Sequence, residues 1–189
     1  MPTLDLGYTR PQLEILFPKD EKRFNVFPCG RRFGKTQGAA HACIEWACDG
    51  HPILWGDTIN ANIAKYVERY FLPALENTGV KHRWRSDKNI LEIANSYIDF
   101  RSADNPENWE GFGYRKIILN EAGIILGDKG GNKGPYLFSN AVLPMMADFD
   151  LSQLYAIGLP KGKLLQSGNE HPFYTLWKKV GVEPNYRGK

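Results

Sequence analysis

Cysteine is scarce in this sequence. Only Cys29, Cys43 and Cys48 occur among 189 residues, an odd number without a C-x-x-C pair, and none of the four histidines stands at metal-ligand spacing. A disulfide framework needs an even set of cysteines, and a zinc site needs paired cysteine or histidine ligands. The sequence therefore argues against both, and it predicts reduced, mostly buried thiols in a cytosolic protein.

Long apolar runs are also missing. No stretch approaches the roughly 18 apolar residues of a membrane-spanning helix, and the N-terminus lacks the charged and then apolar layout of a signal peptide. We expect a soluble protein with no membrane partner. With 189 residues, 42% of them hydrophobic, the chain is long enough for one substantial core, so a single domain is the default expectation.

A large excess of charge of either sign is absent, because the formal net charge is only +3. Basic residues gather at residues 81–85 and again at Lys178 and Lys179. Each cluster is compatible with a solvated face or with a nucleic-acid contact. Charge alone therefore assigns no partner.

What the sequence does contain is an alternation of strand-like and helix-like segments. Residues 24–27 alternate like a strand, a glycine-rich turn follows, and residues 36–47 have the pattern of a small-residue helix. A buried strand at 52–56 and a helix at 63–75 repeat this order. The alternation predicts an α/β fold with a central, mostly parallel sheet flanked by helices.

The rest of the chain continues the pattern. Residues 89–93 and 97–100 flank a short polar turn, which predicts an antiparallel hairpin inserted before the next parallel strand. The remaining expected elements are a strand at 116–119, a glycine-rich loop at 127–135, a helix at 136–147 that is interrupted by Pro144, and a strand at 154–158.

The turn between the first strand and the first long helix reads CGRRFGKT. It differs from the phosphate-binding pattern G-x-x-x-x-G-K-[ST] at Cys29, which is small enough to replace a glycine where the backbone angles are ordinary. In such a loop, backbone N–H groups surround phosphate oxygens, Lys35 reaches the terminal phosphates and the Thr36 hydroxyl ligates Mg²⁺. The predicted nucleotide-binding residues of this loop are Cys29, Gly30, Arg31, Arg32, Phe33, Gly34, Lys35, Thr36 and Gln37.

A second signal lies at the end of the strand at 116–119, where Asn120 and Glu121 follow an apolar run. As the sole acid of this segment, Glu121 would lie beside the γ-phosphate and orient a water for in-line attack. The alternative is that Glu121 only complements a helix dipole. Asn120 offers Mg²⁺ an uncharged amide oxygen, so we expect it to act through a bound water or to weaken metal affinity.

Several further segments follow a recognisable order along nearly the whole chain. They are RPQLEIL from Arg10, the loop CGRRFGKT, FRSADNPENWEGFGYRKIILNEAG from Phe100, LFSNAVLPMMADFD, and IGLPKGK followed by HPFYTLW. Together they resemble the ATPase module of the large terminase subunit, the motor that packages DNA into tailed-phage capsids. The resemblance implies a P-loop NTPase fold of the additional-strand type over residues 1–189, with an inserted β-hairpin.

The resemblance also implies roles for single residues. Gln12 would contact the adenine, the arginine-rich loop would be a Walker A variant, and Glu121 would close Walker B. The coupling segment would link hydrolysis to DNA movement. The implied catalytic residues are Glu121, Lys35, Arg31 and Arg32; Arg10 and Gln12 join the nucleotide-binding loop; Thr36 and Asn120 would hold the metal; and Gly158, Leu159, Pro160, Lys161 and Gly162 would form the coupling segment.

The sequence departs from the family at Asn120, where aspartate is usual, at Leu159, where threonine is usual, and at Glu110, where many members carry an arginine. An acid cannot stabilise negative charge that develops on a phosphate, so another side chain would have to act as arginine finger. For the loop arginines, the alternative is a solvated or salt-bridged outer face. The arginines that could take the role are Arg31 and Arg32, which we prefer, and Arg101 and Arg115.

The implied function is ATP hydrolysis, with ATP and Mg²⁺ as cofactors, that drives double-stranded DNA into the procapsid in the host cytoplasm. The implied partners are DNA, the portal and procapsid, the small terminase subunit, and further copies of the chain in a ring, with a monomer expected in isolation. We also expect a C-terminal RNase H-like nuclease domain in a longer protein, and no nuclease activity from these residues. Competing interpretations are a glutamine-motif helicase or translocase, and a nucleotide-binding assembly module with little turnover.

Overall fold

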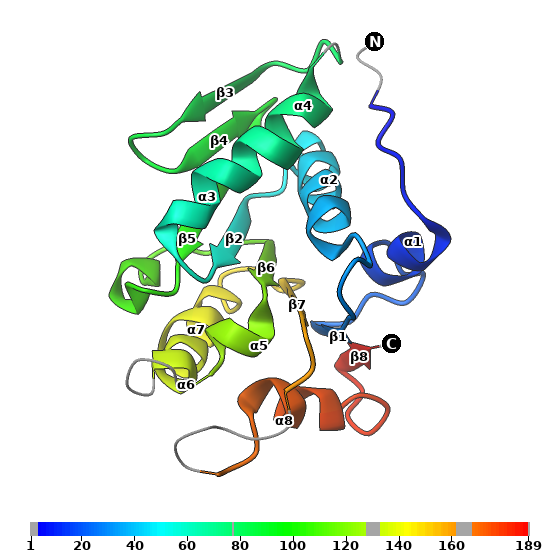
Figure 1. Cartoon of the computed structure of the whole chain (residues 1–189), viewed down its shortest axis with the longest axis vertical. Helices are drawn as coiled ribbons and strands as arrows, with labels where there is room; N and C mark the ends of the chain where they lie inside the picture. Colours follow the sequence, from blue (N-terminus) through cyan, green and yellow to red (C-terminus); the bar gives the residue numbers. More distant parts are fainter. Residues whose placement is uncertain (1–3, 77, 128–132, 162–167, 189) are drawn as a thin grey trace.

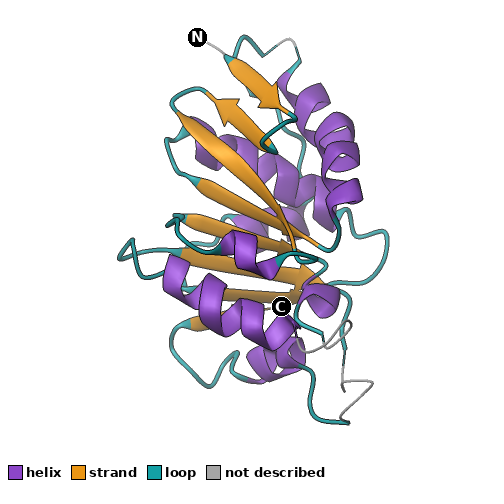
Figure 2. Cartoon of the chain, turned by 90° about the vertical axis from the view of Figure 1, so that its left-hand side faces the viewer, coloured by secondary structure: helices purple, strands orange, loops and turns teal. Residues whose placement is uncertain are grey.

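The computed structural model describes residues 4–76, 78–127, 133–161 and 168–188. These residues form an eight-stranded sheet in the order β3-β4-β5-β2-β6-β7-β1-β8, with helices on both faces (Figures 1 and 2). The strands are β1 (Phe24–Pro28), β2 (Ile53–Asp57), β3 (His82–Arg85), β4 (Ile90–Ile93), β5 (Ser96–Ser102), β6 (Lys116–Asn120), β7 (Gln153–Gly158) and β8 (Tyr186–Gly188).

The central strands are parallel, as the sequence predicts. β7 pairs in parallel with both β1 and β6, β6 pairs in parallel with β2, and β2 pairs in parallel with β5. β7 therefore lies between the strand that precedes the predicted phosphate-binding loop and the strand that ends in Asn120, which is the arrangement expected for the additional-strand type. Because parallel strands point the same way, their carboxyl ends meet at one edge of the sheet.

The helices divide into two layers, each with its own buried core. One core lies under the N-terminal helices and the other under the helices that follow β5. The first layer contains α1 (Arg10–Leu16), α2 (Lys35–Cys48), α3 (Asn60–Tyr66), the π-helical η1 (Val67–Phe71) and α4 (Leu72–Leu75). The second contains η2 (Pro106–Trp109), α5 (Ala122–Ile125), α6 (Lys133–Leu137), the π-helical η3 (Phe138–Val142), α7 (Leu143–Met145) and α8 (Pro172–Lys178).

Small side chains let α2 pack closely on the sheet. Ala39, Ala40, Ala42 and Cys43 are buried with at most 1% of their surface exposed. Such residues bring the helix axis near the strands, so the position of its N-terminus depends little on side-chain flexibility. α2 begins at Lys35, so this packing fixes the position of the Lys35 backbone.

The antiparallel hairpin predicted at 89–93 and 97–100 is confirmed by the pairing of β4 with β5, and the region contains one more strand than predicted. The basic residues at 81–85, considered only as a charged cluster, include β3, an edge strand in which Trp84 packs edge-on against Phe100 at 5.6 Å between ring centroids. The second arm of the predicted hairpin also does more than pair with β4. β5 pairs antiparallel with β4 and parallel with β2, so the hairpin extends the main sheet.

Pro144 does not interrupt its helix as predicted, because the backbone widens just before it. The π-helical segment η3 leads into α7, and Leu143 donates its N–H to the carbonyl of Phe138. A proline has no N–H to donate and its ring crowds the preceding turn, and a π segment relieves both problems. The same solution occurs before Pro73, where η1 leads into α4. Most of the predicted glycine-rich loop at 127–135 lies outside the described residues.

A substitution at Gly56 tests the packing of β2. An added Cβ would lie 2.2 Å from the Trp109 ring, and both residues are buried. We expect Gly56→Ala to lower the free energy of unfolding by about 1–3 kcal/mol through overpacking, measured by urea denaturation. Gly7→Ala is the control, because a Cβ at that exposed glycine meets nothing within 4 Å. Equal stability of the two variants would mean that Trp109 does not seat on β2.

Candidate nucleotide-binding site

The predicted phosphate-binding loop connects β1 to α2 at the carboxyl edge of the sheet. Cys29 is buried, donates its N–H to the Gly158 carbonyl at 2.8 Å and avoids the left-handed backbone region. It therefore meets the condition under which it can replace a glycine. Gly34 caps α2 with a φ of 76° and Arg32 has a φ of 62°. Burial raises the pKa of the Cys29 thiol, with Lys35 opposing the shift, so the thiol stays protonated.

Lys35 and Glu121 face each other across this edge. The Lys35 Nζ lies 2.9 Å from the Glu121 Oε1, and the two side chains are only 12% and 22% exposed. Glu121 occupies the left-handed region with a φ of 64° and a ψ of 47°, and it caps α5. A non-glycine residue in that region is strained, and such strain is common at functional sites. The structure thus brings together the two residues assigned to phosphate binding and to water activation.

A second set of polar groups lies behind this ion pair. The Thr36 hydroxyl is 3.3 Å from the Asn120 Oδ1, and the Asn120 Nδ2 donates to the Asp57 Oδ2 at 2.9 Å. Asp57 and Asn120 are 0% and 1% exposed. Desolvation by burial raises the pKa of Asp57, and hydrogen bonds from Asn120 and Thr58 act in the opposite direction.

Asp57 was not predicted from the sequence. The sequence predicts Glu121 as the sole acid of its segment, whereas the end of β2 places a second carboxyl group on the far side of Asn120. The available signal was Asp57 itself, which directly follows the strand predicted at 52–56. Tyr66 of α3 lies near these groups: burial raises the pKa of its phenol, the negative charges of Asp57 and Glu121 raise it further, and a hydrogen bond with Asn120 lowers it.

The oxygen atoms assembled here suit a magnesium ion. Mg²⁺ prefers hydroxyl, carboxylate, carbonyl and water oxygens, and in nucleotide sites the protein supplies few of them. Thr36 and Asn120 provide such oxygens from two adjacent elements, and the Asp57 carboxylate lies directly behind Asn120. Within the described parts of the chain there is no group of three or more histidine, cysteine, aspartate or glutamate residues that could form an all-protein metal cage.

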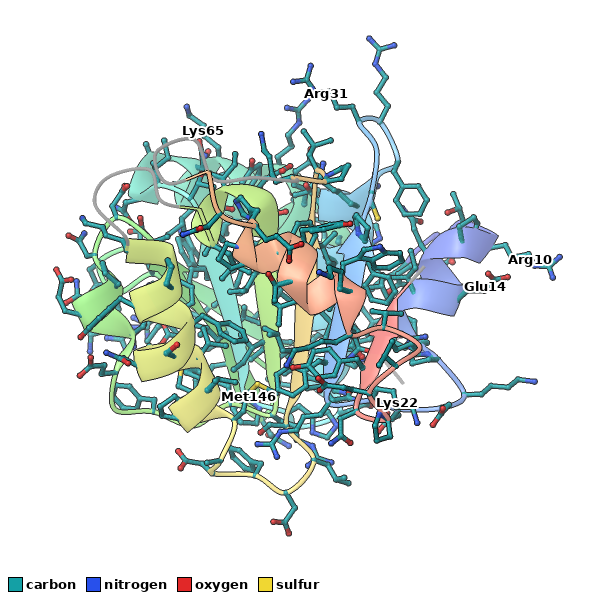
Figure 3. The ribbon with its side chains drawn as sticks, turned by 90° about the horizontal axis from the view of Figure 1, so that it is seen from below. Arg10, Glu14, Lys22, Arg31, Lys65 and Met146 are labelled. Atoms are coloured by element: carbon teal, nitrogen blue, oxygen red, sulfur yellow. The ribbon has the colours of Figure 1, made fainter. Side chains whose placement is uncertain are left out.

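Gln12 holds the loop from the side of α1. Its Nε2 donates to the Gly34 carbonyl at 3.0 Å, its Oε1 accepts from the Thr9 N–H at 2.8 Å, and the residue is 7% exposed. A Cβ at Gly34 would come within 2.8 Å of the Gln12 amide. Contact with an adenine stays a prediction. Arg10 pairs with Glu14 at 3.2 Å and points into solvent, away from the loop (Figure 3).

The candidate arginine fingers differ in whether they are exposed or held by another side chain. Arg31 and Arg32 are exposed, and neither forms an ion pair with another described residue. Arg31 projects from the tip of the loop in Figure 3. Arg101, in contrast, is held by Asp99 at 2.7 Å, and Asp99 also accepts the Tyr114 hydroxyl at 2.6 Å. Arg115 directly precedes β6 and so lies at the amino end of that strand, opposite the edge that carries Asn120. Of the four candidate arginines, Arg31 and Arg32 are therefore the two that lie at this edge without an ion pair to a described residue.

The predicted coupling segment packs directly against the turn that carries Glu121. A Cβ on Gly158 would lie 2.9 Å from the backbone nitrogens of Ala122 and Gly123, and a Cβ on Gly123 would lie 2.4 Å from the Leu159 carbonyl oxygen. Glycine at both positions therefore permits backbone-to-backbone contact. Pro160 and Lys161 follow as exposed residues. Gly162, the last predicted member of the segment, lies outside the described residues.

The arrangement of strands and loops has counterparts among solved structures. The Thermus phage P74-26 large terminase ATPase domain superposes with a TM-score of 0.74 and 17% sequence identity, over 96% of this chain and 80% of that one. The fold is that of a large terminase ATPase domain. The fold predicted from the sequence is thereby confirmed.

Two longer proteins show the same likeness. The large terminase of a thermophilic bacteriophage, solved in complex with ATP-γ-S, gives a TM-score of 0.67 at 16% identity, with 97% of this chain and 44% of that chain covered. The HK97 large terminase gives 0.71 at 14% identity, with 96% and 39% covered. The chain thus spans less than half the length of either protein.

Comparisons of sequence add no relative: no protein-family model and no curated protein matches the chain. Among the described residues, no helix has both the length and the apolar character needed to cross a membrane.

A substitution at Gly123 tests the contact between the Glu121 turn and the predicted coupling segment. We expect Gly123→Ala to push the Leu159 backbone away, because a carbonyl oxygen 2.4 Å from the new Cβ cannot rotate aside as a side chain can. Amide hydrogen exchange at Gly158, Leu159 and Lys161 should then become faster. Ile124→Ala, which alters a 47% exposed side chain on the same helix, should leave that exchange unchanged. Unaltered exchange in Gly123→Ala would contradict the contact.

Proposed function

We propose that this chain is an ATP-hydrolysing motor domain that powers movement of double-stranded DNA during phage genome packaging. One observation carries the proposal: Lys35 pairs with Glu121, and Thr36 pairs with Asn120, where the carboxyl ends of β1 and β6 meet the N-terminus of α2. Support comes from the fold shared with terminase ATPase domains and from the thermophilic-phage large terminase, which is solved with ADP and with ATP-γ-S.

In this mechanism the loop binds the phosphates of ATP. Backbone N–H groups from Gly30 to Thr36 and the N-terminus of α2 favour the negative charge. Lys35 leaves Glu121 for a phosphate oxygen, which is a stronger anionic partner. When bound, Mg²⁺ would be held by the Thr36 hydroxyl with Asn120 beside it and would neutralise charge on the phosphates.

Release from Lys35 gives Glu121 its second task. Its carboxylate, held by the strained turn at the start of α5, orients a water for in-line attack on the γ-phosphate and accepts a proton from that water. The bond between the γ-phosphorus and the β–γ bridging oxygen breaks, and ADP leaves. The exposed Arg31 and Arg32 would stabilise the negative charge that develops on the phosphate in the transition state, either in the same subunit or in a neighbouring one.

Coupling to DNA follows from the packing around Gly123 and Gly158. A displacement of the Glu121 turn on hydrolysis would move the segment that begins at Gly158, because the two backbones are in contact. We assign to the assembled motor a ring of several copies that acts with the portal, the procapsid and the small terminase subunit, while the isolated chain is a monomer.

One observation favours a second candidate. An uncharged amide at Asn120, in the place where the metal needs negative charge, suits a module that binds ATP to order an interface and turns it over slowly. Release of phosphate by the purified chain, measured with malachite green, separates the two: sustained turnover supports the motor, and stoichiometric binding without turnover supports the assembly module.

The first test of the site removes the lysine. Lys35→Ala should weaken ATP binding by about 10- to 100-fold, because charge-assisted hydrogen bonds to phosphate are worth roughly 1.5–3 kcal/mol. Isothermal titration with ATP-γ-S measures the loss. Lys19→Ala, which removes the same charge from an exposed position outside the site, should bind as the wild type does. Equal affinities for the two variants would remove the loop from the site.

The second test removes the base. Glu121→Gln should still bind ATP, while turnover falls by roughly 10²–10⁴-fold, the range attributed to general base catalysis. Glu170→Gln is the matched control, because it breaks a Lys–Glu pair of the same 2.9 Å length on an exposed face. Steady-state hydrolysis is measured beside nucleotide affinity for both. Full turnover in Glu121→Gln would place the base elsewhere.

A further inference from the structure

Asn120 and Asp57 form a pair across two adjacent strands. β2 and β6 run parallel with Gly56 opposite Leu119, so both side chains stand one position beyond the paired residues, at the same level. The Asn120 Nδ2 donates to the Asp57 Oδ2 at 2.9 Å. Neither residue has more than 1% of its surface exposed, which makes this a buried contact that solvent does not weaken.

The pair fixes the orientation of the Asn120 amide. With its Nδ2 on the Asp57 carboxylate, its Oδ1 is directed at the Thr36 hydroxyl, 3.3 Å away. Rotating the amide by half a turn would set two oxygens against each other at Asp57, which is unfavourable in a buried site. Asp57 therefore decides that an oxygen, and not an N–H group, faces Thr36.

Asp57 itself accepts several hydrogen bonds, but none of the described residues gives it a cationic partner. Its Oδ1 accepts from the Thr58 N–H at 2.7 Å and from the Thr58 hydroxyl at 3.3 Å, and its Oδ2 also accepts from the Trp55 indole at 3.3 Å. No lysine or arginine in the described ranges forms an ion pair with it. A buried carboxylate without a cation is costly unless charge of opposite sign comes near.

Glu121 occupies a different position from Asp57. Its carboxylate is bound to Lys35 at 2.9 Å on the open side of the site, whereas Asp57 lies behind Asn120. The two acids are thus separated by their partners into a front position and a rear position. The front position suits a group that changes partner during the reaction, and the rear position suits a fixed support.

We propose that Asp57 is a positioning residue for the magnesium ion of the bound nucleotide: it supplies from β2 the negative charge that Asn120 lacks on β6, and it aims the Asn120 amide oxygen at the metal. The proposal rests on the proposed ATP-binding function. Carboxylates that hold a metal's neighbouring ligands contribute to metal affinity in this way.

The test measures magnesium affinity separately from nucleotide affinity. Binding of ATP-γ-S to the 189-residue chain is titrated at a series of Mg²⁺ concentrations and in EDTA. Asp57→Asn should weaken the apparent Mg²⁺ affinity by about 10- to 100-fold, the usual effect of losing such a support, with affinity in EDTA unchanged. The exchange variant Asp57→Asn with Asn120→Asp, which restores one carboxylate and one amide in swapped positions, should recover the wild-type Mg²⁺ response.

A thermal-unfolding series separates metal positioning from simple packing. Asn120→Asp sets two carboxylates face to face at hydrogen-bond distance, so we expect it to unfold at a lower temperature in EDTA and to recover more than the wild type when Mg²⁺ and nucleotide are added. The inference is overturned if Asp57→Asn loses affinity equally with and without Mg²⁺, or if the exchange variant fails to recover.

Failure of the proposed function gives a different pattern. If the wild type does not bind ATP-γ-S, or if Lys35→Ala binds it equally well, both proposals fall. If the Lys35 and Glu121 variants behave as expected while Asp57→Asn keeps full Mg²⁺ affinity, only the role of Asp57 is wrong.

Discussion

Parallel pairing of the central strands is the constraint on which the rest of this structure depends. The four central strands β1, β7, β6 and β2 all point the same way. Their last residues therefore lie at one edge of the sheet: Pro28, Gly158, Asn120 and Asp57. Groups separated by tens of residues in sequence are thereby brought within hydrogen-bond distance. The site needs no long reaching loop, because the register of the sheet already sets the spacing.

Glycine and small residues carry this order from the sheet to its edge. The absence of a side chain at Gly34 allows Gln12 to contact the loop, and glycine at 158 and 123 allows two turns to contact each other. The alanines of α2 allow the helix that begins at Lys35 to pack closely on the sheet. Close backbone contacts of this kind have few alternative arrangements, since there are no side chains to repack.

Much of the fold could be predicted from the sequence, and the reasons are local. The strands at β1, β2, β6 and β7 have apolar runs, and the loop before α2 has a spacing that few other structures require. The short edge strand β3 is not predicted, because it is mostly charged and Trp84 is its one apolar residue that packs against the core. The helical segments before Pro73 and Pro144 were harder still, since a π turn leaves no signature in composition.

The site was predictable where residues lie in one segment and obscure where they come from two. Lys35 and Glu121 were named from motifs, but their ion pair depends on the order of β1, β7 and β6. Asp57 belongs to no motif, and its meaning appears only when β2 lies beside β6. Gln12 was named as a ligand contact, while the bond to Gly34 that holds the loop depends on the tertiary position of α1.

The outer edges of the sheet have a bearing on how copies of the domain can meet. β3 is an edge strand whose backbone groups on one side are not used by the sheet, and His82 and Arg83 are exposed along it. The opposite edge, β8, is only three residues long. Charged or very short edge strands discourage the endless strand-to-strand joining that leads to aggregates. Both outer edges of this sheet therefore carry features that disfavour joining of copies strand to strand.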